Sequence, residues 1–106
     1  MAPVRVAAVG DIPPGSMAAF AIADTDVLVA NVDGVLYAIN NICSHAYAEL
    51  SDGELDTDDC SVTCPVHGSA FDLRTGRPNI MPAFMPVPTY RVSVQGDDVL
   101  VDIEEA

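Results

Sequence analysis

Two short motifs in the chain each place a cysteine close to a histidine. One residue separates Cys43 from His45, and two residues separate Cys64 from His67. These are the only two histidines in the 106-residue chain. Thiolate sulfur and imidazole nitrogen both bind zinc and iron, so the pattern predicts a metal centre built from Cys43, His45, Cys64 and His67.

Two kinds of centre accept two cysteines and two histidines. Zinc takes such a set tetrahedrally, usually as a structural site. A [2Fe–2S] cluster takes it with the cysteines on one iron and the histidines on the other. The Cys-x-His spacing is tighter than the usual zinc pairings, and each motif supplies one thiolate and one imidazole. The spacing therefore favours the cluster and leaves a structural zinc module as the alternative.

The ligand motifs lie in a segment from about residue 40 to 88 that holds all three cysteines and five of the eight prolines. Loops and short hairpins are expected there. On either side the sequence predicts strands, because it is rich in β-branched residues and lacks a long helical period. Asp33-Gly34 and the stretch 95–97 are typical of hairpin turns. The expected strands cover residues 4–9, 16–23, 26–32, 35–39, 90–94 and 98–103.

The composition narrows the class of protein. Sixteen acidic residues against four arginines and no lysine give a formal net charge of −12, which repels nucleic acid and anionic membranes. This charge serves either simple solubility or docking to a basic partner protein. No apolar run reaches the roughly 20 residues of a membrane helix, and the N-terminus does not match a signal peptide. We expect a single-domain, soluble, cytoplasmic protein.

The motifs CSH and CPVHGSAFDLRTGRP resemble those of Rieske iron–sulfur proteins. The segments LSDGEL, PAFMPVP and YRVSVQGDDVLVDI extend this resemblance, over nearly the whole chain, to the small Rieske-type ferredoxins of bacteria. The resemblance implies one [2Fe–2S] cluster, with Cys43 and Cys64 on one iron and His45 and His67 on the other. It also implies an all-β fold of stacked antiparallel sheets. A single domain would span 1–106, with a cluster-binding subdomain of about 41–85 inserted in a β base formed by 1–40 and 86–106.

The sequence departs from the Rieske proteins of respiratory quinol-oxidising complexes. Those proteins tie their two ligand loops with a disulfide, whereas the matching positions here are Ala48 and Val66. The serine near the cluster remains as Ser69, but the tyrosine position is Phe71, which has no hydroxyl. Fewer hydrogen-bond donors stabilise the reduced cluster less, so we expect a potential toward the ~−150 mV end of the Rieske range.

The number of histidines also indicates whether the chain could be an oxygenase. Rieske oxygenases need a second iron held by two histidines and a carboxylate, and here the cluster uses both histidines. The chain is therefore expected to carry electrons rather than to catalyse a reaction. The resemblance implies a ferredoxin that passes single electrons from a flavin reductase to the terminal oxygenase of a multicomponent aromatic-ring dioxygenase. A monomer is favoured because such a carrier shuttles between its partners. The alternatives are service to another redox system, such as iron–sulfur cluster assembly, and a clusterless Rieske-fold subunit of nitrite reductases, which the four intact ligands disfavour.

Further expectations concern the surroundings of the centre. Cys60 is expected to be a partly buried thiol that binds no iron. Gly68 is expected to let the backbone approach the cluster. The histidine edges are expected at the exposed tip, beside a collar of Pro82, Phe84 and Met85, with Pro82 nearest the cluster by resemblance. Six acidic residues and no lysine or arginine lie between residues 41 and 70, and they predict a negative flank: Glu49, Asp52, Glu54, Asp56, Asp58 and Asp59.

Overall fold

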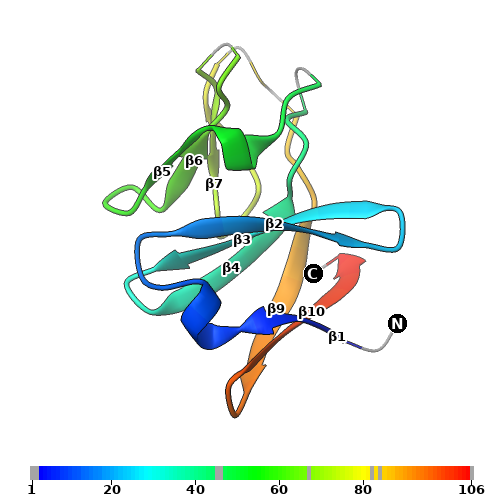
Figure 1. Ribbon diagram of the computed structural model, residues 1–106. Coiled ribbons are helices and arrows are strands. Elements are labelled where there is room, and N and C mark those ends of the chain that lie inside the picture. Colours follow the sequence, from blue (N-terminus) through cyan, green and yellow to red (C-terminus); the bar gives the residue numbers. More distant parts are fainter. Residues whose placement is uncertain (1–2, 45–46, 67, 82, 84, 106) are drawn as a thin grey trace.

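The computed structural model describes residues 3–44, 47–66, 68–81, 83 and 85–105. Within these residues the regular elements are ten strands and two short 3₁₀ turns, η1 (Val9–Asp11) and η2 (Leu50–Asp52). Six antiparallel strands form the larger sheet, in the order β1-β10-β9-β4-β3-β2 (Figure 1). Its strands are β1 (Val4–Ala8), β2 (Met17–Ile22), β3 (Thr25–Val32), β4 (Val35–Asn40), β9 (Thr89–Gln95) and β10 (Asp98–Glu105).

The smaller sheet is built from the middle of the chain and has four strands in the order β5-β6-β7-β8. Each strand has three residues: β5 (Glu54–Asp56), β6 (Ser61–Thr63), β7 (Ala70–Asp72) and β8 (Pro78–Ile80). This sheet lies at one end of the molecule, above the larger sheet in the view of Figure 1. The expectation of an all-β protein with stacked antiparallel sheets is confirmed.

Tight turns close the long hairpins of the larger sheet. Asp33 and Gly34 connect β3 to β4 with φ values of 54° and 92°, the pair of positive angles that a type I′ turn requires. Gly96, with φ 59°, turns β9 into β10. These two turns match the sequence expectation. The β2–β3 turn does not follow a sequence signal, because Ala23 adopts φ 53°, an angle that alanine rarely takes.

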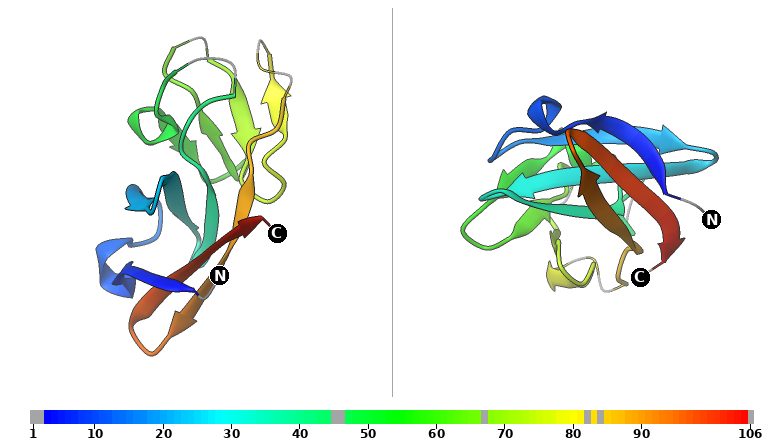
Figure 2. Two further views of the ribbon diagram at one scale, coloured as in Figure 1. Left: turned by 90° about the vertical axis from the view of Figure 1, so that its right-hand side faces the viewer. Right: turned by 90° about the horizontal axis from the view of Figure 1, so that it is seen from below.

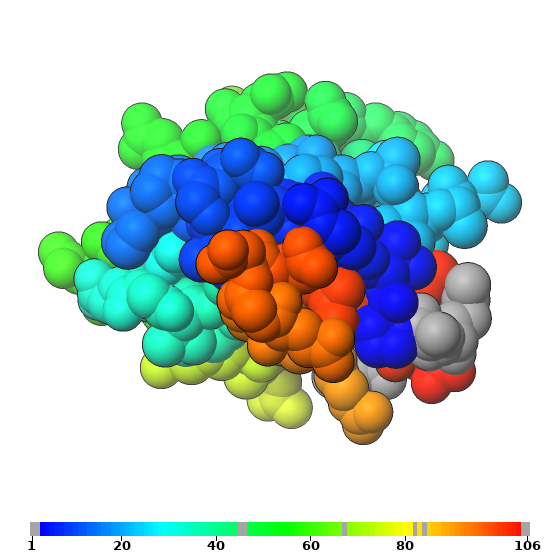
Figure 3. Space-filling view, turned by 60° about the horizontal axis from the view of Figure 1, so that its bottom comes forward, coloured from blue at the N-terminus to red at the C-terminus, as the bar shows by residue number. Residues whose placement is uncertain are grey.

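The larger sheet curls around its own core. Side chains from β1, β2, β3, β4, β9 and β10 meet in one buried cluster, in which Val27, Val29 and Val101 are fully buried. The N-terminal segment and the β9–β10 turn close this core, since β1 pairs with β10 and the Val9 N–H donates to the Asp97 carbonyl at 2.7 Å. The two segments lie side by side in the space-filling view (Figure 3). This curled sheet is hereafter called the β base.

A second core lies between the β base and the smaller sheet. Leu28, Ala30 and Ile39 supply it from β3 and β4, while Val62 and Phe71 supply it from β6 and β7. Successive residues of β3 thus enter different cores, as the two-residue period of a strand dictates. Strand β3 is buried from Val27 to Val32 for this reason. Among the described residues, no helix is long and apolar enough to cross a membrane.

Candidate metal centre

The first ligand loop leaves the end of β4 and returns at η2. Asn41, at its start, is fully buried and is bonded on both sides of the loop. Its backbone N–H donates to the Asp26 carbonyl at 2.8 Å, and its side-chain Oδ1 accepts the Ser51 N–H at 2.9 Å. Closer to the tip, the Cys43 N–H donates to the Ala48 carbonyl at 2.9 Å. The β base therefore fixes the root of the loop, and a short bridge places Cys43.

The second ligand loop joins β6 to β7. The Cys64 N–H donates to the Ser69 carbonyl at 2.6 Å, and the Gly68 N–H donates back to the Cys64 carbonyl at 3.2 Å. Gly68 adopts φ 74°, which favours glycine. A Cβ built at Gly68 meets nothing within 4 Å in the protein, so backbone conformation requires this glycine, rather than contact with described protein atoms. Close approach of its backbone to the cluster stays a prediction.

The two ligand-loop cysteines both belong to the second core. Cys43 is 4% exposed and Cys64 is 2% exposed, and both belong to the same packed cluster as Phe71 and Leu73. All three cysteines of the chain lie within the described residues, and none of them forms a disulfide. Two buried thiols on two neighbouring loops fit the thiolate half of a [2Fe–2S] centre. The expected imidazole ligands, His45 and His67, lie outside the described residues.

A third loop, residues 81–88, runs beside both ligand loops (Figure 2). The buried Ser69 hydroxyl of the second ligand loop accepts the Ala83 N–H at 2.9 Å. The Ser44 hydroxyl of the first ligand loop donates to the Met85 carbonyl at 2.6 Å. Phe71 is fully buried in the core below, so its ring is a packing element there. Pro82 and Phe84 of the expected collar lie outside the described residues, and Met85 is exposed. The position of this collar beside the histidines stays a prediction.

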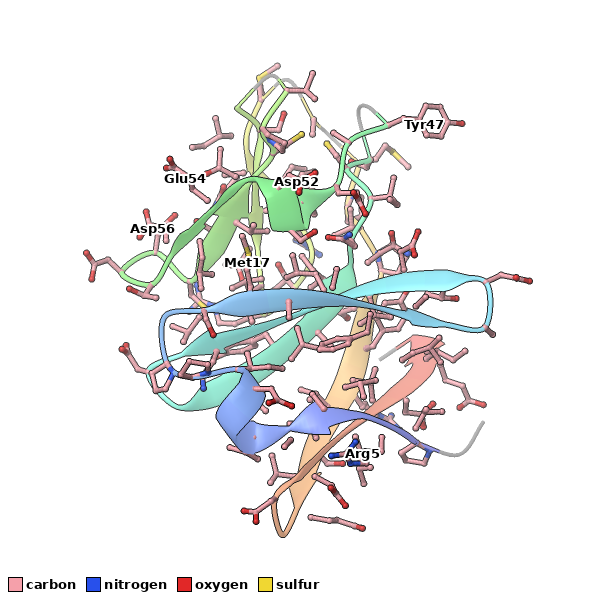
Figure 4. The ribbon with its side chains drawn as sticks, viewed as in Figure 1. Arg5, Met17, Tyr47, Asp52, Glu54 and Asp56 are labelled. Atoms are coloured by element: carbon pink, nitrogen blue, oxygen red, sulfur yellow. The ribbon has the colours of Figure 1, made fainter. Side chains whose placement is uncertain are left out.

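The end of the molecule that carries the three loops has an apolar surface, here called the apolar tip. Its members come from all three loops: Tyr47, Val66, Met81 and Met85. Tyr47 is the most exposed, at 105% of its reference area, and points away from the body of the protein (Figure 4). Exposed apolar side chains gathered at one end commonly mark a surface that contacts another protein.

The negative flank lies next to this tip. All six carboxylate residues of the stretch 49–59 are exposed, in agreement with the sequence expectation. An open hollow of about 400 Å³ is lined by Asp52 and Glu54 of the flank and by Cys64, Pro65 and Gly68 of the second ligand loop. Asp56 also shapes its own turn, because its Oδ1 accepts the N–H groups of Asp58 and Asp59 at 3.0 and 3.1 Å.

Of the two arginines that follow the second ligand loop, Arg74 is paired with a carboxylate. The Arg74 guanidinium bonds the Asp72 carboxylate at 2.9 Å on the turn after β7. This contact lowers the pKa of Asp72 below its ordinary value, against a smaller opposing effect of burial. Because Arg74 bonds this carboxylate, it does little to offset the charge of the acidic flank.

Cys60 lies apart from the ligand loops. Its carbonyl accepts the Leu73 N–H at 3.0 Å, and its side chain packs against the edge of the second core. Burial raises the pKa of the neighbouring Tyr37 phenol, and the Cys60 thiol raises it further. The expectation of a partly buried thiol is confirmed. That Cys60 binds no iron stays a prediction.

The sequence interpretation missed two residues that shape the centre. Asn41 links the first ligand loop to the β base, and Ser44 links that loop to the third loop. Consecutive asparagines before a ligand motif are a usable signal for Asn41, since asparagine side chains often bond nearby backbone groups. Ser44 gave no signal, because its partner is a backbone carbonyl 41 residues away.

Comparison with known proteins identifies the class to which this fold and these loops belong. The chain matches the Rieske [2Fe-2S] domain over residues 2–91, and so belongs to the Rieske [2Fe–2S] family. Its cofactor is a Rieske-type [2Fe–2S] cluster.

Individual relatives narrow the class further. The ferredoxin component of biphenyl 2,3-dioxygenase from Rhodococcus jostii (strain RHA1) is 41% identical over 104 residues, covering 98% of this chain and 95% of that protein. The ferredoxin of carbazole 1,9a-dioxygenase from Nocardioides aromaticivorans IC177 superposes with a TM-score of 0.92 at 40% identity, covering 95% of this chain and 97% of the other. The chain is thus an electron-carrying ferredoxin rather than an oxygenase.

A further structural match comes from a complex of reduced oxygenase and oxidized ferredoxin in carbazole 1,9a-dioxygenase. Its matching chain has a TM-score of 0.90 and 32% identity, with coverage of 98% of this chain and 95% of the other. In that system, a ferredoxin of this fold assembles with an oxygenase.

Proposed function

We propose that Cys43, His45, Cys64 and His67 bind the [2Fe–2S] cluster, and that the chain passes single electrons from a flavin reductase to the terminal oxygenase of an aromatic-ring dioxygenase. The observation that carries this proposal is that Cys43 and Cys64, from two loops, are both buried in one core cluster beneath an exposed apolar tip. The relatives named above support the dioxygenase system as the setting.

The chain's own residues suit this task in two ways. Burial of the two cysteines limits the access of water to the sulfur side of the centre, which protects thiolate ligands there. The exposed tip lets a partner approach the other side closely, with small apolar side chains such as Val66 at the contact. The bound cluster supplies one-electron chemistry at moderate potential, since two thiolates and two neutral imidazoles leave its oxidised form uncharged.

The acidic flank is proposed to guide the same encounter. Exposed carboxylates beside the tip attract a basic partner over several ångströms, and the apolar tip then makes the close contact. Redox encounters of this kind use small, short-lived interfaces. We also propose that the chain acts as a cytoplasmic monomer, and that residues 41–85 form a cluster-binding subdomain within a single domain.

The ligand assignment is tested by replacing each proposed imidazole in turn. His67→Ala or His45→Ala removes one ligand of the histidine-bound iron, so the purified protein is expected to lose its red-brown colour and its Rieske electron paramagnetic resonance (EPR) signal. Cys60→Ser is the matched control and is expected to retain full iron content and a potential near that of the wild type. A wild-type EPR signal in either histidine variant, or loss of the cluster in Cys60→Ser, would overturn the assignment.

The partner assignment needs a separate measurement. Stopped-flow reduction of the purified holoprotein by a flavin-dependent dioxygenase reductase, followed by single-turnover oxidation with the matching terminal oxygenase, measures both transfers. Electron transfer from the reductase to the ferredoxin, and from the ferredoxin to the oxygenase, is expected to be fast with the reductase and oxygenase of a biphenyl or carbazole dioxygenase system. Failure with such pairs, together with efficient electron delivery to iron–sulfur assembly proteins, would favour the other redox system.

A further inference from the structure

We propose that Ser44 is a positioning residue that holds the first ligand loop to the third loop, so that the third loop acts as a non-covalent strap between the two ligand loops. The inference rests on the ligand assignment proposed above. It concerns how the two loops keep their separation in a chain that has Ala48 and Val66 where related respiratory proteins have a disulfide.

The strap is fixed at its root by backbone hydrogen bonds. The Asn40 N–H donates to the Pro88 carbonyl at 2.8 Å, which joins the strap to the β base. The Val87 N–H donates to the Gly76 carbonyl at 2.9 Å, which joins it to the turn after β7. A Cβ at Gly76 would lie 2.1 Å from the Val87 carbonyl oxygen, so the close approach of these segments depends on glycine.

The outer part of the strap is held by two serine side chains instead. Ala83 donates to the Ser69 hydroxyl of the second ligand loop, and Met85 accepts from the Ser44 hydroxyl of the first. Along the strap, Ala83 and Val87 are buried and face the core, whereas Met85 is 56% exposed. One hydrogen bond therefore joins the strap to each ligand loop, at Met85 for the first and at Ala83 for the second.

Of the two serines, Ser44 is the better one to replace in a test of the strap. Ser69 is 1% exposed, so replacing it perturbs the core as well as the hydrogen bond. Ser44 is exposed, and its side chain donates the 2.6 Å hydrogen bond to the strap. Removing its hydroxyl therefore loosens the link between the loops while leaving the packing of the core intact.

The experiment compares Ser44→Ala with the wild-type holoprotein. Loss of one hydrogen bond is expected to make cluster release to a ferrous chelator about fivefold faster, and to speed amide exchange of the peptide 81–88 by a similar factor. The visible circular dichroism of the cluster is also expected to change, because it reports the asymmetry of the ligand environment. Ser44→Thr restores a hydroxyl and is expected to restore all three measurements.

The β base offers a matched control. The Ser16 hydroxyl donates to the Pro13 carbonyl at the same distance, 2.6 Å, in an exposed loop far from the ligand loops in the sequence. Ser16→Ala removes an equivalent bond and is expected to leave cluster release, strap exchange and circular dichroism unchanged. A purely structural effect of losing a serine–carbonyl bond would appear in both variants.

The outcomes separate the two proposals. Wild-type cluster release and strap exchange in Ser44→Ala, or equal changes in Ser16→Ala, would overturn the strap. If His67→Ala retained a normal Rieske signal, the ligand assignment would fall, whatever the serine variants did. Faster strap exchange and cluster release confined to Ser44→Ala, and reversed in Ser44→Thr, would establish Ser44 as the link.

Discussion

The β base and the ligand-loop end of this protein are stabilised in different ways. The base uses strands of five to eight residues that curl around a closed core containing Val27, Val29 and Val101. The other end has strands of three residues, loops held by individual hydrogen bonds and an exposed apolar tip. Buried apolar area supports the base, whereas the tip needs additional links. This contrast predicts that the stability of the ligand-loop end depends on the bound cluster more than that of the β base does.

Removal of the cluster is expected to produce the largest difference between the two regions. A bound group that recognises only the folded loops stabilises them, so its loss should unfold those loops first. After chelation of iron, amide exchange of the peptide 61–73 is expected to rise about 100-fold, equivalent to ~2.7 kcal/mol of local stability. Peptides from the β base are expected to change far less.

Hydrogen exchange with mass spectrometry measures both regions in one experiment. Reconstitution with iron and sulfide is the control, and it should restore protection in residues 61–73. Equal loss of protection in the base and in the ligand-loop end would mean that the chain folds as one cooperative unit and would remove the proposed contrast.

A pair of glycine substitutions probes the same contrast without touching the ligands. A Cβ at Gly53 would lie 1.7 Å from the Thr63 carbonyl oxygen, where β5 begins beside β6. Gly53→Ala must therefore push these strands apart and is expected to lower the stability of the holoprotein by about 1–3 kcal/mol. Thermal unfolding monitored by the visible absorbance of the cluster provides the measurement.

Gly10 in the β base is the matched site. A Cβ there meets nothing within 4 Å, and the residue does not adopt a positive φ. Gly10→Ala is expected to be neutral or slightly stabilising, because it reduces the freedom of the unfolded chain. Similar destabilisation by the two substitutions would show that contact at Gly53 is not the cause.

Two equally exposed valines test whether docking uses the apolar tip. Val66 in the second ligand loop is 50% exposed, and Val94 in the base is 49% exposed. Burial of the Val66 methyl groups in an interface is worth about 1 kcal/mol, so Val66→Ala is expected to raise the ferredoxin KM of the oxygenase about fivefold. Val94→Ala should leave this KM unchanged, and an equal effect of both would argue against the tip.

The smallest effect is expected from the acidic flank. Replacing three of its carboxylates by amides weakens attraction to a basic reductase while the Asp56 side chain keeps an acceptor oxygen for its turn. The triple variant Asp56→Asn/Asp58→Asn/Asp59→Asn is expected to be reduced roughly threefold more slowly at low ionic strength. The difference should vanish as salt is raised, and the potential should stay nearly constant.

A second triple variant changes the net charge equally in the β base. Its substitutions are Asp24→Asn, Asp33→Asn and Asp97→Asn, at three exposed positions in turns. Association rates measured across a salt series should respond to the flank variant and much less to the base variant. Equal responses would show that total charge matters rather than its position, and the flank would then serve only solubility.

The sequence predicted the β base better than the loops, and the reason is physical. Long segments of alternating residues and the Asp33-Gly34 turn are determined by the local sequence. For this reason β3, β4, β9 and β10 begin and end close to the expected residues. Strands of three residues have too little pattern to delimit them. The turn at Ala23 was also missed, because its positive φ is imposed by the strands on either side.

For the centre, the sequence predicted the ligand types but not their supports. Cysteine and histidine are recognisable as candidate ligands because few other side chains bind iron. The structure places both ligand-loop cysteines in one core. The supports, by contrast, pair side chains with backbone groups elsewhere in the chain. A carbonyl such as that of Met85 can come from any residue type, so the contact with Ser44 leaves no trace in the sequence.

The strap also has a consequence for how the protein matures. A preformed cluster enters a folded chain only if the two loops part and then close again. The hydrogen bonds of Ser44 and Ser69 open and re-form spontaneously, whereas a disulfide between the loops would open and close only by thiol–disulfide exchange. Because Ala48 and Val66 cannot form such a bond, the proposed strap would let the loops close around the cluster without an oxidant.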